Sequence, residues 1–196
     1  PRAEEHNLNV PQPRYAVTKT VLKMDESPAT SEFHIGVNVA ASHFRHDTLL
    51  RDLNQSWFSA NPAQQLVVEL TERDALRDVD YRIVRELHRK GVKLAIDDFG
   101  TGNSSLSWLE KLHPDVLKID KSFTTAIGTD AVNSTVTDII IALGQRLNIE
   151  LVAEGVETGE QAAWLIHRGV THLQGYIFSR PLRPETLIDY FRRHNA

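Results

Sequence analysis

Polar side chains recur at the points where short apolar segments of this sequence end. The stretch KLAIDDFGTGNSSL, residues 93–106, begins as a buried strand and then places Asp97 and Asp98 side by side before a glycine-rich turn. The other apolar segments also end in polar residues, which are Asn38, Glu69, Lys118, Glu154 and Gln174. Because the carboxyl ends of parallel strands lie on one face of an α/β fold, we expect these side chains to meet in one pocket.

The chemistry of such a pocket is that of a divalent metal site. Its oxygen donors would be four carboxylates and one amide, on Glu69, Asp97, Asp98, Glu154 and Asn38. Hard cations such as Mg²⁺ or Mn²⁺ prefer these ligands, and like charges in a pocket of low dielectric require compensating cations. Two metals about 3.5–4 Å apart, bridged by one of the adjacent aspartates, can clamp the attacking and leaving oxygens of phosphodiester hydrolysis. Lys118 is a candidate to orient the water or to offset phosphate charge.

Each of these residues also has an ordinary structural interpretation. An aspartate at a strand end is usually a turn former or a helix cap, so Asp98 could simply open the turn that follows it. Lys118 taken alone would be a solvated surface charge. Glu72, in the segment ELTER, is either an acid at a helix start or a residue that positions the loop after Asp98. The recurrence of polar residues at six predicted strand ends favours the metal pocket.

Two local motifs indicate other functions and lack the rest of their patterns. Asp98-Phe99-Gly100 matches the metal-binding triplet of protein kinases, but no H-R-D loop or V-A-I-K strand accompanies it, which excludes a kinase. Gly100-Thr101-Gly102 begins like a dinucleotide-binding loop, but Ser105 stands where the third glycine belongs. The absence of cysteine excludes disulfides, zinc–thiolate sites and cysteine nucleophiles within this chain.

The composition is that of one globular domain with no nucleic-acid signature. The 196 residues are 41% hydrophobic and 24% charged, with a formal net charge of −4. This balance gives no basic excess for binding duplex nucleic acid. The longest aliphatic run, residues 139–143, is far shorter than a membrane span, and the first residues contain no signal-peptide core. The chain does not start with Met, and we expect it to begin partway through a larger protein.

Strands and helices are predicted to alternate along the chain. Strands are expected at 33–38, 66–70, 92–98, 115–120, 149–154 and 170–175. Helices are expected near 12–26, 47–58, 78–90, 104–112, 130–147, 158–168 and 184–194, with Asp78, Gly91 and the Thr158–Gln161 capping box as end signals. Such alternation predicts a parallel sheet, closed as a (β/α)₈ barrel or open and doubly wound. Six strands favour an open sheet or a barrel that lacks two units.

Five motifs together resemble those of the EAL domain, the bacterial family of cyclic-di-GMP phosphodiesterases. They are VVELTER (67–73), AIDDFGTGNSSL (95–106), PDVLKID (114–120), LVAEGVET (151–158) and LQGYIFSRPL (173–182), and they cover essentially the whole chain. The resemblance implies a modified TIM-like (β/α) barrel, here with about six of its eight strands. It also implies hydrolysis of cyclic di-GMP to linear pGpG with two Mg²⁺ or Mn²⁺ ions.

The resemblance implies a role for each motif residue. Asn38, Glu69 and Asp97 would bind the first metal, and Asp97, Asp98 and Glu154 would serve the second metal and the water. Lys118 would help to position the water and Gln174 would support the water or the substrate. Thr101 and Gly102 would belong to the loop that often mediates dimerisation and metal-site closure in this family, and Glu72 would anchor that loop. Glu157 would be an acid behind the site. Loss of catalytic ability would instead leave a cyclic-di-GMP receptor or a protein-interaction module, and an unrelated metal-dependent barrel hydrolase is a third alternative.

Two departures from the family pattern qualify these expectations. The Glu-Ala-Leu signature is absent, because PRAEEHNL resembles a segment that follows it, so residues 1–196 would form a single EAL domain that is incomplete at its N-terminus. One metal-binding Glu and two strands would then be missing, and the chain as given is expected to be weakly active or inactive. Asn103 replaces the usual Tyr of the glycine-rich loop.

The resemblance also bears on partners and location. The strand edges at 33–38 and 170–175 are expected to pair with another chain or to leave the fold poorly stable. The family resemblance favours a homodimer and a cytoplasmic domain. It allows an upstream sensor or membrane segment that would anchor a parent protein in the inner membrane.

Overall fold

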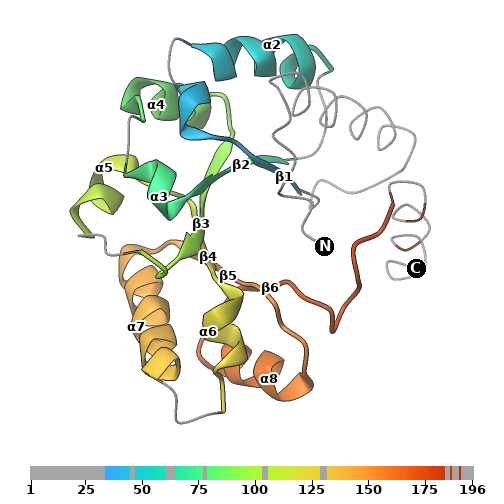
Figure 1. Cartoon of the computed structure of the whole chain (residues 1–196). Coiled ribbons are helices and arrows are strands. Elements are labelled where there is room, and N and C mark those ends of the chain that lie inside the picture. Colours follow the sequence, from blue (N-terminus) through green and yellow to red (C-terminus); the bar gives the residue numbers. More distant parts are fainter. Residues whose placement is uncertain are drawn as a thin grey trace.

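The computed structural model describes the strands and helices of the central part of the chain (Figure 1). The described residues are 34–44, 47–60, 65–76, 79–102, 106–128, 132–183, 186 and 190. The helix expected near 12–26 lies outside them, as does most of the one expected near 184–194.

Within the described residues, six parallel strands form one sheet whose order follows the chain, from β1 to β6. Their bounds are β1 His34–Asn38, β2 Gln65–Thr71, β3 Lys93–Phe99, β4 Val116–Ile119, β5 Glu150–Ala153 and β6 His172–Leu173. A doubly wound sheet reverses its strand order at a switch point, which this order lacks. The fold is therefore the α/β arrangement of a TIM-like barrel with six strands, one of the two closures expected from the sequence.

The helices lie around the outside of the curved sheet (Figure 1). Their bounds are α2 Thr48–Ala60, α3 Glu72–Ala75, α4 Tyr81–Arg89, α5 Leu109–Leu112, α6 Lys121–Thr125, α7 Val132–Leu147 and α8 Gly159–His167, with short 3₁₀ turns η1 Ala41–Phe44 and η2 Leu106–Trp108. The sequence patterns did not predict α3, α6 or η1, because a single turn is too short to show helical periodicity. None of the described helices is long and apolar enough to cross a membrane.

Capping residues fix where two of the predicted helices start. Helix α4 begins after Asp80, whose carboxylate accepts a hydrogen bond from the backbone N–H of Arg82, so the start lies two residues beyond the predicted Asp78. The capping box of α8 is confirmed, with Thr158 accepting from Gln161 N–H and the Gln161 side chain accepting from Thr158 N–H. Gly91, with φ of 75°, follows α4 as predicted.

The two faces of the sheet differ in chemistry. Alternate residues such as Leu94, Ile96, Leu117 and Ile119 pack with the helices in the main core. The opposite, inner face carries a separate small cluster of Val67, Ala95 and Val116, with Val152 against it. Lys118 follows Val116 by two residues on that inner face. The alternation therefore sends every second strand residue away from the helices, toward the inside of the curve.

The curvature of the sheet brings its two edge strands toward each other. The rings of His34 and His172, the first residues of β1 and β6, lie edge to face with centroids 6.4 Å apart. Within the described residues β1 pairs only with β2 and β6 only with β5. These are the edges for which we predict pairing with another chain or low stability, and that prediction stands to be measured.

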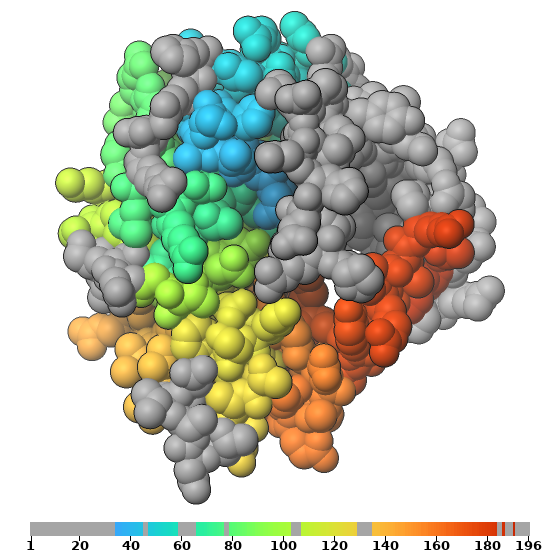
Figure 2. Space-filling view, viewed as in Figure 1, coloured from blue at the N-terminus to red at the C-terminus, as the bar shows by residue number. Residues whose placement is uncertain are grey.

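An apolar stretch follows β6 on the surface. Figure 2 shows this segment in red beside the orange α8. Its exposed large apolar side chains are Tyr176, Ile177, Phe178 and Leu182. Gly175 begins the stretch so close to the backbone of Val156 that a Cβ atom there would lie 2.1 Å from the Val156 carbonyl oxygen, and this crossing requires glycine.

Replacing Leu117 with Ala tests the assignment of the outer face as the main core. Leu117 is fully buried, so the change should lower the free energy of unfolding by about 2–5 kcal/mol, measured by urea denaturation. The control is Ile139→Ala on α7, where the side chain is 63% exposed and the change should stay within about 0.5 kcal/mol. A loss at Leu117 no larger than that at Ile139 would contradict the assignment.

Candidate active site

A buried lysine surrounded by three carboxylates forms the centre of the inner face. Lys118 Nζ lies 2.6 Å from Glu69 Oε2, 3.1 Å from Asp97 Oδ1 and 2.7 Å from Glu154 Oε1. Lys118 is 7% exposed, which excludes the solvated surface charge considered from the sequence. The four side chains come from β2, β3, β4 and the residue after β5, so parallel strands far apart in the chain meet here as expected.

The charges of this group depend on one another. Burial disfavours the charged form of Lys118, but attraction to Glu69, Glu154 and Asp97 outweighs burial and raises the lysine pKa above its ordinary value. Burial raises the pKa of Glu154, and the neighbouring Lys118 offsets only part of that effect. The lysine therefore remains an ammonium that compensates part of the negative charge gathered around it.

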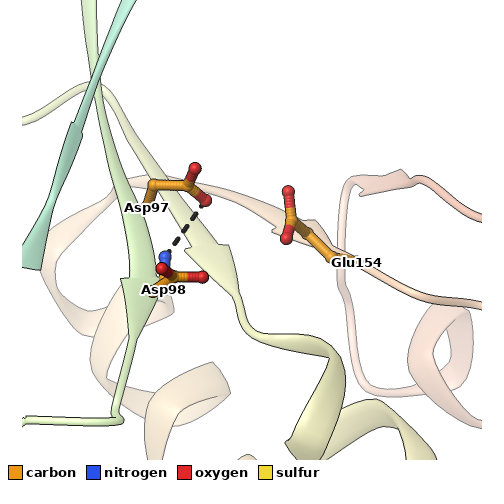
Figure 3. A group of neighbouring side chains, drawn as sticks. All are labelled: Asp97, Asp98 and Glu154. Atoms are coloured by element: carbon orange, nitrogen blue, oxygen red, sulfur yellow. Dashed lines mark hydrogen bonds between the residues drawn. The ribbon is translucent and has the colours of Figure 1, made fainter. Parts of the chain in front are cut away.

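The adjacent aspartates both reach this group because the end of β3 is irregular. In a regular strand Asp97 and Asp98 would point to opposite faces. Here the pairing of β3 with β4 shifts register between Ile96 and Phe99, and Asp98 adopts a left-handed φ of 53°. Asp98 N–H donates to Asp97 Oδ1 at 3.0 Å. Figure 3 shows both aspartates on the side of β3 that faces Glu154.

Asp97, Asp98 and Glu154 are placed to hold a cation. One ligand oxygen from each lies within 4.8 Å of the others, and all three are oxygen donors of the kind that hard divalent cations prefer. Glu69 joins the same group through Lys118. With one ammonium set against four neighbouring carboxylates, the residues fit a divalent cation in both donor type and charge.

Glu72 holds the glycine-rich loop that follows Asp98. It is 3% exposed at the start of α3, and its Oε2 accepts hydrogen bonds from Gly100 N–H at 2.9 Å and from Gly102 N–H at 3.2 Å. A Cβ atom at Gly102 would lie 2.7 Å from Glu72 Oε1. Both interpretations of Glu72 therefore apply: it starts a helix and it fastens the loop. Thr101 Oγ1 donates to Asp98 O at 2.9 Å, closing the turn.

The remaining predicted site residues lie around this centre at different distances. Asn38, at the end of β1, stands opposite Glu69 in the strand register and is exposed. Gln174 lies one residue beyond the short β6 and lines the same cavity as Glu69 and Lys118. Glu157 is exposed before α8, and its N–H donates to Gln161 Oε1, so its established contact is with the helix cap.

The sequence patterns did not single out a second polar group, at the opposite end of the same strands. A cavity of about 280 Å³ is lined at one end by Glu69, Lys118 and Gln174 and at the other by His34, Lys93, Glu150 and His172. Lys93 Nζ and Glu150 Oε1 are 2.7 Å apart across it. The alternation of side chains along a strand could have identified this group. Lys93 and Glu150 precede Asp97 and Glu154 by four residues, so they lie on the same face of the sheet as those acids.

Asp120 shows that position after a strand does not by itself place a residue in the site. It directly follows β4, yet its carboxylate accepts a hydrogen bond from Ser122 N–H and caps α6. Asp120 therefore has the ordinary role of an aspartate at a strand end, which is to cap the helix that follows.

Comparison with known proteins agrees with this fold. The family described as EAL domain matches residues 1–181. A protein of Escherichia coli K12 described as probable cyclic di-GMP phosphodiesterase PdeD is 70% identical over 182 residues, covering 93% of this chain and 34% of that protein. The solved complex of the PaMucR phosphodiesterase with c-di-GMP is 33% identical with a TM-score of 0.79, covering 89% of this chain and 72% of that one. The Klebsiella pneumoniae BlrP1 complex with manganese and cyclic di-GMP is 28% identical with a TM-score of 0.74, covering 86% and 44%.

These solved structures share the TIM-like α/β fold of this chain. The chain belongs to the EAL domain family. It spans about a third of the length of the curated relatives it matches.

Replacing Lys118 with Met tests the charge balance of the site. The change removes the ammonium and leaves Glu69, Asp97 and Glu154 facing one another, so stability in metal-free buffer should fall by about 3–5 kcal/mol in urea denaturation. The matched control is Lys93→Met, because the Lys93–Glu150 pair is partly exposed and its loss should cost less than about 1 kcal/mol. Equal losses of stability in the Lys118 and Lys93 variants would contradict a buried charge group at Lys118.

Replacing Glu72 with Ala tests whether this carboxylate fastens the loop. Gly100 and Gly102 would lose their acceptor, which we expect to cost about 1–3 kcal/mol locally and to accelerate amide hydrogen exchange in the segment 99–102. Glu86→Ala on α4 serves as the control and should leave that segment unchanged. Unaltered exchange in the Glu72 variant would mean that other contacts hold the loop.

Proposed function

We propose that this chain supplies most of a metal-dependent site that hydrolyses cyclic di-GMP to linear pGpG. The observation that carries the proposal is the group around Lys118, in which Glu69, Asp97 and Glu154 converge with Asp98 beside them. Relatives described as cyclic di-GMP phosphodiesterases support the same reaction. Degenerate EAL modules would be expected to lose acids at the strand ends, and none of those acids is lost in the segment that this chain covers.

The proposed cofactor is a pair of Mg²⁺ or Mn²⁺ ions. Asn38, Glu69 and Asp97 would hold the first, while Asp97, Asp98 and Glu154 would hold the second. When bound, the metals would act as Lewis acids toward the phosphodiester and lower the pKa of the attacking water. The complex of BlrP1 with manganese and cyclic di-GMP supports a divalent cation as cofactor.

The chain's own residues would position the reactants. Lys118 would help to position the attacking water through the three carboxylates that it holds, and its ammonium would offset charge on the phosphate. Glu154 would accept a proton of that water, because burial raises the pKa of its carboxylate and Lys118 holds it at the site. Gln174, with both hydrogen-bond donors and an acceptor on its side chain, would hold the water or a polar group of the substrate at the cavity mouth.

Outer residues would keep the site in shape and link it to a partner. Glu72 would hold the loop containing Thr101 and Gly102, so that Asp98 keeps its left-handed backbone. Glu157 would add negative charge behind Glu154.

We further propose that the EAL domain is cytoplasmic, acts as a homodimer, and can be joined to a sensor or membrane segment in a parent protein.

Replacing Glu154 with Gln tests the catalytic assignment. The variant is compared with its parent in whichever form turns over cyclic di-GMP, the purified chain or the chain extended with the segment that carries the Glu-Ala-Leu signature of a relative. Each is incubated with cyclic di-GMP and Mn²⁺ or Mg²⁺, and pGpG is measured by chromatography. Because the near-isosteric amide cannot accept the proton, turnover should fall by about 10²–10⁴-fold. Circular dichroism should show an intact fold. The control is Glu160→Gln in the exposed first turn of α8, which should not change turnover.

A second arm separates low activity from a wrong function. The same assay is run on the chain extended with the segment that carries the Glu-Ala-Leu signature of a relative. Turnover in either form supports the proposal, and turnover only after extension supports the predicted need for a further metal-binding Glu. Binding of cyclic di-GMP without turnover in both forms would favour the receptor alternative, and absence of both would contradict both functions.

A further inference from the structure

We propose that Gly36 is a positioning residue for Glu69, because it leaves open the space that the Glu69 carboxylate occupies. The inference rests on the proposed function insofar as Glu69 is one of the proposed metal ligands. It concerns the β1 strand, whose own contribution to the site was expected from Asn38 alone. Gly36 would act on the metal through Glu69 and without touching it.

The geometry leaves no room for a side chain at position 36. Gly36 lies in the middle of β1, two residues before Asn38, and β1 pairs with β2 so that Asn38 stands opposite Glu69. A Cβ atom on Gly36 would lie 2.0 Å from Glu69 Oε1 and 3.0 Å from its Cδ. The first distance is far inside van der Waals contact, so a methyl group and the carboxylate cannot occupy their present positions together.

The other oxygen of the same carboxylate is held from the opposite side. Glu69 Oε2 accepts a hydrogen bond from Lys118 Nζ at 2.6 Å, and Lys118 is itself fixed by Asp97 and Glu154. The Glu69 side chain is 15% exposed. The carboxylate therefore lies between the β1 backbone and the buried ammonium. It is the end of a flexible side chain, so a methyl group at position 36 would move it away from its present place beside Lys118.

Backbone conformation does not explain this glycine. The glycines with left-handed φ among the described residues are Gly91, Gly100, Gly128, Gly155 and Gly169, and Gly36 is not one of them. A glycine inside a strand lowers stability relative to alanine by about 0.5–1 kcal/mol. Such a glycine often marks a place where another group must come close to the strand backbone. At Gly36 that group is the Glu69 carboxylate.

The consequence is a specific effect on metal affinity. A residue larger than glycine at position 36 should displace Glu69 from Lys118 and from the neighbouring acids. Substitutions in residues that orient metal ligands typically weaken metal binding by about 10–100-fold. We expect a loss in this range for Gly36→Ala, although alanine suits the strand backbone better than glycine.

A double-mutant cycle tests the inference. Mn²⁺ affinity is measured by titration calorimetry for the wild-type chain, Gly36→Ala, Glu69→Ala and the double variant. Gly36→Ala should weaken binding about 10–100-fold in the wild-type background and have no further effect once Glu69 is alanine. The matched control is Gly159→Ala, because a Cβ atom there meets nothing within 4 Å, and Mn²⁺ binding should be unchanged.

The same cycle is repeated by urea denaturation in metal-free buffer, which gives a readout that does not depend on metal. Gly36→Ala should lower the unfolding midpoint only when Glu69 is present and should leave it unchanged or raised in the Glu69→Ala background. If Gly36→Ala does not fold but the double variant does, the result supports the inference that Gly36 leaves space for the Glu69 side chain. If neither folds, the inference is overturned.

The outcomes separate this inference from the proposed function. Failure of the wild-type chain to bind Mn²⁺ would count against the proposed function, and the denaturation cycle would then decide the relation between Gly36 and Glu69. If the wild-type chain binds Mn²⁺ and Gly36→Ala binds it equally well, only the inference is wrong. Equal effects of Gly36→Ala in both backgrounds would also overturn it, since Gly36 would then act through the strand rather than through Glu69.

Discussion

The site depends on one buried ammonium that three carboxylates approach from neighbouring strands. Lys118 is almost inaccessible, so its charge is tolerable only because Glu69, Asp97 and Glu154 lie within ion-pair distance. The carboxylates in turn require the ammonium, since they would repel one another without a cation between them. This mutual requirement ties β2, β3, β4 and the end of β5 into one arrangement. It also leaves excess negative charge, which is what a site for divalent cations needs.

The sheet serves two purposes through its two faces. Residues such as Leu117 and Ile119 bury an apolar face against the helices, while Val116 and Lys118, alternating with them on β4, face the inside of the curve. A side chain on the inner face can therefore be charged without disturbing the main core. The turns after the strands add their own constraints, as Glu72 does by holding Gly100 and Gly102 beside the metal-binding acids proposed here.

The sequence predicted much of the fold and the centre of the site, and the misses have physical reasons. Strand ends were located to within a few residues because apolar runs stop where the acids begin. The short helices α3 and α6 were missed, since one turn carries no periodic signal. Asp120 resembles the site aspartates in position but caps a helix. The inner group of His34, Lys93, Glu150 and His172 was missed because its members open strands rather than end them, and no motif marks them.

By itself the sequence determined the alternation of strands and helices, the types of residue at the strand ends and, through its motifs, the EAL family. These follow from local patterns of apolar residues, turn formers and caps, which need no knowledge of distant contacts. Only the tertiary structure decided that Lys118 is buried among the acids, that Asp98 turns beside Asp97 through a left-handed backbone, and that Gly36 leaves room for Glu69. Each of these depends on the register and curvature of strands far apart in the chain, and register is set by packing of the whole sheet rather than by any one segment.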